Sequence, residues 1–175
     1  MLLRKQYNFM YTIIAGTNRV ESNSHRIGRV YQELLAEMGF GSGIFTLEGL
    51  DLNTKSKSFL AFQDKILMPS NKFIIILPEY NGSYPGIFKS IIDLSDIKAC
   101  WQNKKALLVG VATGRGGNVR GLDHITGVLH YINVLVHPNK LPISSVDKIL
   151  NEEGKIKDAR TMTSIKRQLT EFINF

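Results

Sequence analysis

The sequence predicts an α/β fold in which a parallel sheet is covered by helices on both faces. Three observations lead to this prediction. Short apolar runs alternate along the chain with longer segments whose apolar residues recur at helical spacing. The apolar runs are continuous, as in strands that are buried on both faces of a parallel sheet. Gly, Asn, Ser and Pro gather where one kind of segment gives way to the next.

The apolar runs define the strands, and the stretches between them define the helices. The first run ends at Gly16, and Gly39 stops the helix that follows it. Another helix begins after Pro85, a residue that starts helices well. The predicted strands cover residues 11–15, 43–47, 73–77, 106–112 and 134–136. The predicted helices cover residues 25–38, 58–67, 87–94 and 122–129, and a last one carries Ile156, Met162, Ile165, Leu169 and Phe172.

This alternation, combined with right-handed crossovers, favours the strand order 2-1-3-4-5 of a flavodoxin-like three-layer sandwich. Residues 137–145 contain two prolines and are predicted to form a loop rather than a domain boundary. Residues 10–175 therefore read as one domain of ordinary size. Residues 1–9 read as an N-terminal extension that adds little to the fold.

Composition narrows the classes of protein that fit this chain. Hydrophobic residues make up 43% and charged residues 21%, which is typical of a globular chain. No apolar run approaches the roughly 20 residues that span a bilayer, and the N-terminus lacks the apolar core of a signal peptide. A lone cysteine, Cys100, fits a reducing compartment. We therefore expect a cytoplasmic protein with no membrane partner.

The net charge of +7 comes from 22 Lys and Arg against 15 Asp and Glu. Such a charge attracts anions, but the basic residues are dispersed and no run of five like charges occurs. A solvated basic surface is favoured over a face that binds a polyanion. We expect no nucleic-acid partner.

The loops after the first, third and fourth strands meet at one edge of such a sheet, where open α/β sheets bind their ligands. The first loop leads into a helix N-terminus, whose free N–H groups and dipole favour an anion. Hydroxyls and a guanidinium there would add to a phosphate site. The alternative is an ordinary helix cap by Ser24, with the rest solvated. The residues expected to hold phosphate are Thr17, Arg19, Ser22 and Ser24.

The second and third loops offer a platform and a row of backbone donors. Tyr80 could stack on a planar ring, and Asn81 and Gly82 permit the positive φ of a tight turn. The alternative is a plain turn with Tyr80 packed over the sheet edge. The second loop contributes Pro78, Glu79, Tyr80, Asn81 and Gly82. The third contributes Thr113, Gly114, Arg115, Gly116 and Gly117, whose bare backbone can approach a ligand closely unless it is only a turn.

Together the loops match flavin mononucleotide (FMN), which has a phosphate, a flat ring and polar ring edges. The residues also resemble a known family. Gly16-Thr17-x-Arg19-x-x-Ser22 resembles the Gly-Ser-x-Arg-x-x-Ser loop of NADPH-dependent FMN reductases. Residues 78–86 resemble their Pro-Glu-Tyr-Asn-x-Ser-x-Pro-Gly segment nearly letter for letter, and residues 114–117 resemble their third loop.

The resemblance covers about residues 10–142 and implies bound FMN, reduction by NADPH or NADH, and a homodimer or homotetramer. It implies a small-molecule electron acceptor such as a quinone, free flavin, azo dye or chromate. Two departures stand out: Ser24 replaces the Asn of many members, and residues 94–99 lack their Ser-Arg-Pro.

We expect a ping-pong exchange in which the cofactor performs the redox chemistry, so no catalytic acid–base residue is predicted. The four histidines lack a close ligand pair, and no metal site is predicted. Two alternatives remain open. One is a non-enzymatic flavodoxin-like electron carrier between protein partners, and the other is a flavin-free regulatory or nucleic-acid-binding module on the same fold.

Overall fold

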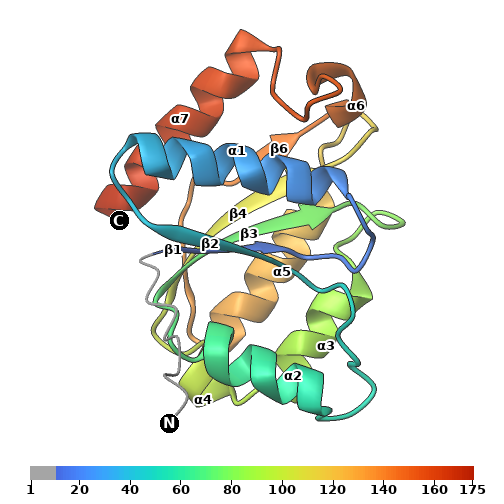
Figure 1. Ribbon diagram of the computed structural model, residues 1–175, viewed down its shortest axis with the longest axis vertical. Coiled ribbons are helices and arrows are strands. Elements are labelled where there is room, and N and C mark those ends of the chain that lie inside the picture. Colours follow the sequence, from blue (N-terminus) through green and yellow to red (C-terminus); the bar gives the residue numbers. More distant parts are fainter. Residues whose placement is uncertain (1–10) are drawn as a thin grey trace, which may run out of the picture.

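The computed structural model describes residues 11–175, so the extension predicted at residues 1–9 lies outside the described residues. Its centre is a parallel sheet with the strand order β2-β1-β3-β4-β5, and β6 pairs with β4 as well (Figure 1). The strands are β1 (Tyr11–Ala15), β2 (Ser42–Thr46), β3 (Lys72–Pro78), β4 (Lys105–Val111), β5 (Leu135–Val136) and β6 (Leu141–Ile143). The predicted flavodoxin-like order is confirmed.

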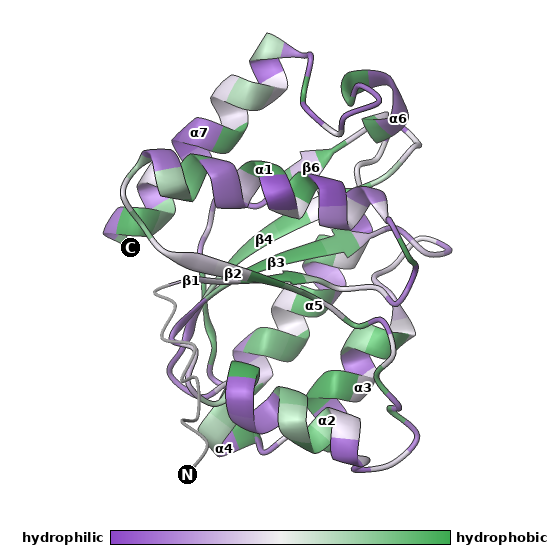
Figure 2. Cartoon of the chain, in the orientation of Figure 1, coloured by the Kyte–Doolittle hydropathy of each residue, from purple (hydrophilic) through white to green (hydrophobic). Residues whose placement is uncertain are grey.

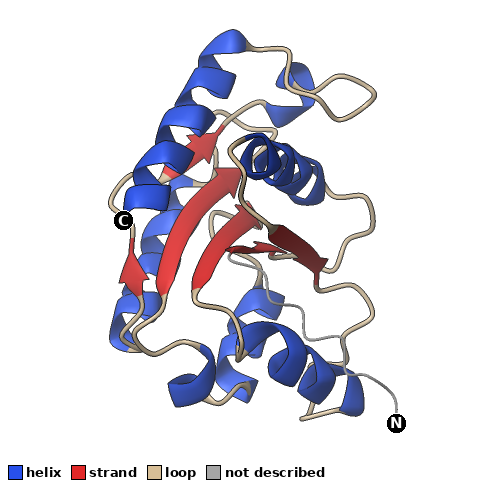
Figure 3. Ribbon diagram, turned by 60° about the vertical axis from the view of Figure 1, so that its left-hand side comes forward, coloured by secondary structure: helices blue, strands red, loops and turns tan. Residues whose placement is uncertain are grey.

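Helices cover both faces of the sheet, which makes a three-layer sandwich (Figures 1 and 3). One face carries α1 (Asn23–Glu37), α6 (Val146–Ile149) and α7 (Ala159–Asn174). The other carries α2 (Lys57–Phe62), the π-helical turn η1 (Gln63–Leu67), α3 (Gly86–Leu94), α4 (Ile97–Cys100) and α5 (Val119–Tyr131).

The alternation of side chains along β3 explains how one strand serves two cores. Ile74 and Ile76 belong to the cluster under α1 and α7, whereas Phe73, Ile75 and Leu77 belong to the cluster over α3 and α5. All five side chains are fully buried, and burying each contributes about 1.5–3 kcal/mol. Figure 2 shows the result: β3 and β4 are hydrophobic along their length, while the helices alternate hydrophobic and hydrophilic stretches.

Two expectations about the second half of the chain were wrong. Residues 137–145 were expected to be a loop, but Leu141–Ile143 form β6. Pro142 is tolerated because β6 lies at the sheet edge, where a missing N–H breaks no pairing. Ile156, expected on the last helix, instead forms an isolated bridge with Leu150. The helix begins later because Asp158 caps it by accepting a hydrogen bond from the Thr161 N–H (2.7 Å).

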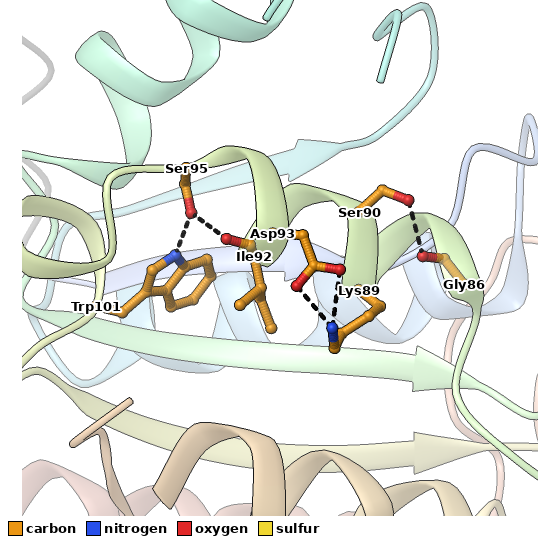
Figure 4. A network of polar contacts seen from close by, with 7 residues as sticks. All are labelled: Gly86, Lys89, Ser90, Ile92, Asp93, Ser95 and Trp101. Atoms are coloured by element: carbon orange, nitrogen blue, oxygen red, sulfur yellow. Dashed lines mark hydrogen bonds and ion pairs between the residues drawn. The ribbon is translucent and has the colours of Figure 1, made fainter. Parts of the chain in front are cut away.

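The segment after α3 is held in place by hydrogen bonds between Ser95 and its neighbours (Figure 4). Ser95 Oγ accepts a hydrogen bond from the Trp101 indole N–H (2.7 Å) and donates one to the Ile92 carbonyl (2.9 Å). Trp101 is fully buried, so its polar edge needs this partner. Beside it, Lys89 and Asp93 form an ion pair one helical turn apart (2.6 Å). Ser95 therefore links the end of α3 to the buried Trp101.

The edge strand of the sheet is split, and a buried glutamine fills the break. Residues 137–140 separate β5 from β6, so no strand pairs with β4 between them. There the Gln168 side-chain amide donates to the Leu108 carbonyl (3.1 Å) and to the Asn139 carbonyl (2.7 Å). Its oxygen accepts from the Tyr31 hydroxyl (2.5 Å). Gln168 has no exposed surface, so it ties α7, α1 and β4 together in the interior.

A buried lysine, Lys104, lies just before the start of β4 and forms hydrogen bonds with the C-terminal end of η1. Lys104 Nζ donates to the carbonyls of Leu67 (2.7 Å), the last residue of η1, and of Met68 (2.9 Å), the residue after it. The residue is only 8% exposed. Burial lowers the pKa of Lys104 to about 8, because the charged form loses its hydration.

Replacing Gln168 by leucine should destabilise the fold through lost polar contacts rather than lost volume. The substitution leaves the Leu108 carbonyl and the Tyr31 hydroxyl without a hydrogen-bond partner in the interior. We therefore expect the free energy of unfolding in urea to fall by about 2–4 kcal/mol. Tyr31→Phe removes one of these contacts and is the matched control, with a loss of about 1 kcal/mol. A Gln168→Leu loss no larger than that of the control would contradict the bridging role.

The pKa of Lys104 predicts how stability depends on pH. Because the folded-state pKa of about 8 lies below the ordinary value of 10.5, the unfolded chain binds more protons between these two pH values. The free energy of unfolding of the wild type should therefore rise with pH across this window, by roughly 3 kcal/mol relative to Lys104→Met. Urea unfolding of both proteins at several pH values tests this. A difference that stays constant from neutral to alkaline pH would refute the depressed pKa.

Candidate functional site

The first two predicted loops meet through a hydrogen bond. The Thr17 hydroxyl, almost fully buried at the end of β1, lies 2.6 Å from the Tyr80 hydroxyl at the end of β3. The same Thr17 oxygen accepts a hydrogen bond from the Arg19 N–H (3.2 Å). The Arg19 guanidinium lies over the Tyr80 ring, 4.3 Å from its centre, in a cation–π contact. One face of the Tyr80 ring is therefore covered by the first loop.

Tyr80 opens a tight turn that projects from the sheet edge. Its N–H donates to the Ser83 carbonyl (2.8 Å), and the Ser83 N–H donates back to the Tyr80 carbonyl (3.1 Å). Between them, Asn81 and Gly82 have φ values of 51° and 79°. Positive φ at both central positions suits Asn-Gly, since glycine carries no Cβ and asparagine tolerates the left-handed region. The predicted tight turn is confirmed.

The third loop is tied to the second by Asn118, which sequence reasoning did not single out as a site residue. Asn118 is left-handed (φ 66°), and its amide donates to the carbonyls of Leu77 (3.0 Å) and Pro78 (3.1 Å). Gly117 before it is also left-handed (φ 57°), and a Cβ there would lie 2.8 Å from the Pro142 carbonyl carbon. A Cβ on Gly116 would lie 3.9 Å from a Glu79 carboxylate oxygen. The three predicted loops therefore lie together.

A pocket of about 340 Å³ opens where these loops meet. The predicted residues that line it are Arg19, Ser22, Ser24, Pro78, Glu79, Tyr80 and Thr113. Thr17 stands behind Tyr80, and Asn81, Gly82, Gly114, Arg115, Gly116 and Gly117 belong to the same loops outside this lining. The lining residues that the sequence did not indicate are Val20, Glu21, Asn23, Arg26, Val111, Ala112 and Val146.

Arg26 could have been found from the sequence, and Val146 could not. Arg26 follows Ser22 by four positions, so a helix that begins at Ser22 places both at the same end. The predicted helix began at His25, so Arg26 already lay in its first turn, but it was not indicated as a site residue. Val146 comes from the start of α6, a helix too short for its periodicity to be visible. Its place in the lining depends on β6, which was expected to be a loop.

The helix end of the pocket has unused hydrogen-bonding groups. Ser22 caps α1 by accepting from the His25 N–H (3.2 Å), so the alternative in which Ser24 is the cap is wrong. Ser24 instead is the second residue of the helix, fully buried in its first turn, and its hydroxyl has no hydrogen-bond partner. The N–H groups of Asn23 and Ser24 are in the first turn, where the helix itself offers no acceptor. These donors converge on one end of the pocket.

The charges around the pocket are mixed. Arg19 and Arg26 line it together with Glu21 and Glu79. His25 lies in an adjoining pocket that shares Glu21 and Arg26. Burial and then the nearby Arg29 lower the pKa of His25, with Glu48 partly opposing them. His25 is therefore largely neutral at pH 7, and the arginines are the cations at this end of α1.

An open parallel α/β sheet with a pocket across the ends of β1, β3 and β4 defines a protein of the class that binds flavins or nucleotides. The family model for NADPH-dependent FMN reductases matches residues 11–147 of the chain. The chain belongs to this family. It is therefore an oxidoreductase that uses FMN and a nicotinamide nucleotide, and the predicted family and cofactors are confirmed.

Individual relatives agree with this assignment. An NAD(P)H-dependent FMN reductase of Pseudomonas aeruginosa is 25% identical over 146 residues, which cover 77% of this chain and 78% of that protein. A 2-hydroxy-1,4-benzoquinone reductase of Burkholderia sp. is 23% identical over 154 residues, covering 82% and 83%. The fold is similar to that of FerB, an NAD(P)H:(acceptor) oxidoreductase of Paracoccus denitrificans, with a TM-score of 0.77 and 20% identity over 95% of this chain and 96% of that one.

The residues at the helix end fit the phosphate of FMN. A buried hydroxyl without a partner is costly unless a ligand supplies one, and Ser24 is such a group. It sits beside free N–H groups and two arginines, a donor set that suits a phosphate and not a cation. Within residues 11–175, no helix is long and apolar enough to cross a membrane. No three His, Cys, Asp or Glu side chains in that part of the chain could share a metal ion.

Proposed function

We propose that this protein moves hydride from NADPH or NADH through bound FMN to a small acceptor: a quinone, free flavin, an azo compound or a metal oxyanion. The observation that carries the proposal is the meeting of the three loops, with Thr17 bonded to Tyr80 and the unpaired Ser24 hydroxyl at the far end of the same pocket. Names of the relatives support quinone and flavin acceptors.

In this proposal some residues of the first loop bind the phosphate, and others hold the loop in its conformation. Ser24, Arg19 and the first N–H groups of α1 hold the phosphate. Thr17 and Ser22, whose oxygens already have partners within the loop, keep these donors in position. Arg19 would reach the phosphate from the face of Tyr80, which a long and flexible side chain allows.

The second and third loops hold the ring. Residues 78–82 frame it, with Tyr80 beside it and with its orientation fixed by the hydrogen bond to Thr17. Residues 113–117 are mostly exposed, so their N–H groups are free to donate to the polar edge of the ring. Donors at that edge stabilise the negative charge that develops when hydride arrives.

When bound, FMN would supply the redox chemistry, with the nicotinamide nucleotide and then the acceptor using the same place in a ping-pong exchange. The protein binds, orients and shields, and no side chain is assigned as a catalytic acid or base. We further propose that residues 10–175 act as a single flavin-binding domain, in a homodimer or homotetramer in the cytoplasm. The lone buried Cys100 supports the last point.

Rapid mixing with the nicotinamide nucleotide tests the function. FMN-loaded protein, mixed without oxygen with NADPH or NADH, should lose its yellow absorbance within seconds, and a benzoquinone added next should restore it. Steady-state rates should give the parallel lines of a ping-pong scheme. An electron carrier would keep its colour with either nucleotide, and protein that ignores added FMN would support a flavin-free module.

Ser24→Ala should separate phosphate binding from folding. The hydroxyl has no partner in the ligand-free protein, so the free energy of unfolding without FMN should stay unchanged or rise slightly. FMN should bind about tenfold more weakly, since one charge-assisted hydrogen bond to phosphate is lost.

Ser22→Ala is the matched control: it removes the cap of α1 and should lower the free energy of unfolding by about 1 kcal/mol. Urea unfolding and fluorescence titration with FMN measure both effects. Unchanged FMN affinity in Ser24→Ala would remove this serine from the site.

A further inference from the structure

The start of α5 packs directly on the second loop along one face of the helix. Asn118, Gly121 and His124 are spaced three apart, so they lie on the same side. The Asn118 side-chain amide donates hydrogen bonds to the carbonyls of Leu77 and Pro78. A Cβ on Gly121 would lie 2.7 Å from the Tyr84 backbone nitrogen, so only glycine permits this approach. The third member of the face, His124, therefore faces the turn that Tyr80 opens.

His124 makes one contact with that turn. Its Nδ1 lies 2.9 Å from the Ser83 hydroxyl oxygen, which is hydrogen-bonding distance. The turn from Tyr80 to Ser83 is thereby attached at both ends to other parts of the chain. Tyr80 is held by Thr17 and Arg19 of the first loop, and Ser83 is held by α5.

We infer that His124 is a positioning residue, which sets the place of the Tyr80–Ser83 turn through the Ser83 hydroxyl. The inference rests on the proposed function, in which this turn frames the flavin ring. His124 itself bonds to the turn and is not among the residues that line the pocket. Of the two ring nitrogens of His124, Nδ1 is the one that holds the turn, because the hydrogen bond joins that atom to Ser83.

The atom involved permits a rescue test. An asparagine amide occupies about the place of Nδ1 in histidine, whereas a glutamine amide reaches about the place of Nε2. His124→Asn should therefore keep the contact, and both His124→Ala and His124→Gln should lose it. Asparagine is a poorer helix former than alanine or glutamine, so rescue by asparagine would not come from a more stable α5. His130→Ala, which changes an exposed histidine farther along the same helix, is the matched control.

The first measurement needs no flavin. Hydrogen exchange of the Tyr80 and Ser83 amides, which bond each other's carbonyls across the turn, reports how well the turn is held. In His124→Ala and His124→Gln we expect exchange of these two amides to be about three- to tenfold faster than in wild type, the effect of losing one hydrogen bond. In His124→Asn and His130→Ala the rates should match wild type. Equal rates in all four variants would overturn the inference.

The second measurement follows the bound cofactor. His124→Ala should weaken FMN binding by about three- to tenfold and shift the visible absorbance of the bound flavin, while His124→Asn should restore both. Ser83→Ala should give the same loss, and the double variant should lose no more than either single one, since both act through one contact. Additive losses would show that His124 acts by another route and would overturn the inference.

The two proposals fail in different ways. If wild-type protein binds no FMN, the proposed function fails, while the amide exchange still reports whether His124 holds the turn. If wild type binds FMN and is reduced by NADPH, but all His124 variants exchange and bind like wild type, only the positioning role fails.

Discussion

The structure depends on the in-register parallel pairing of β3 with β1 on one side and β4 on the other. Ile74 pairs with Ile13 and with Leu107, and all three are fully buried. Because side chains alternate between the two faces, a shift of one residue would carry each face's apolar side chains into the opposite core. The pairing also fixes where the strands end. Thr17 and Tyr80 meet because β1 and β3 are aligned, so the site is a consequence of the packing of the sheet.

Short polar side chains near the strand ends form hydrogen bonds that connect the loops of the site in the absence of a ligand. Thr17, Ser22 and Asn118 use their side chains on neighbouring backbone or on Tyr80. Ser24 is buried beside them and has no such partner. Polar residues at these strand ends thus fall into two groups, those that build the loops and those that remain available to a ligand. Composition alone does not separate them, because serine serves in both.

The sequence predicted the sheet, its order and the meeting of three loops, because long apolar runs and amphipathic stripes are strong local signals. It did not predict β6, where Pro142 argues against a strand and only pairing with β4 decides the outcome. It also missed Asn118, whose importance comes from a left-handed backbone and from carbonyls far away in the sequence. Tyr80 was expected to stack on a planar ring, but the Arg19 contact on one face of its ring depends on side-chain geometry that no sequence pattern records.

The divided border strand has a consequence for the behaviour of the protein in concentrated solution. A long, flat outer strand offers a row of unpaired N–H and C=O groups to which other molecules can add, and this is a route to aggregation. Here that border is two short pieces, β5 and β6, with Pro142 in the second and a glutamine side chain in the gap. Another molecule would find no continuous template on this side. The break in the ladder protects the sheet from open-ended self-association.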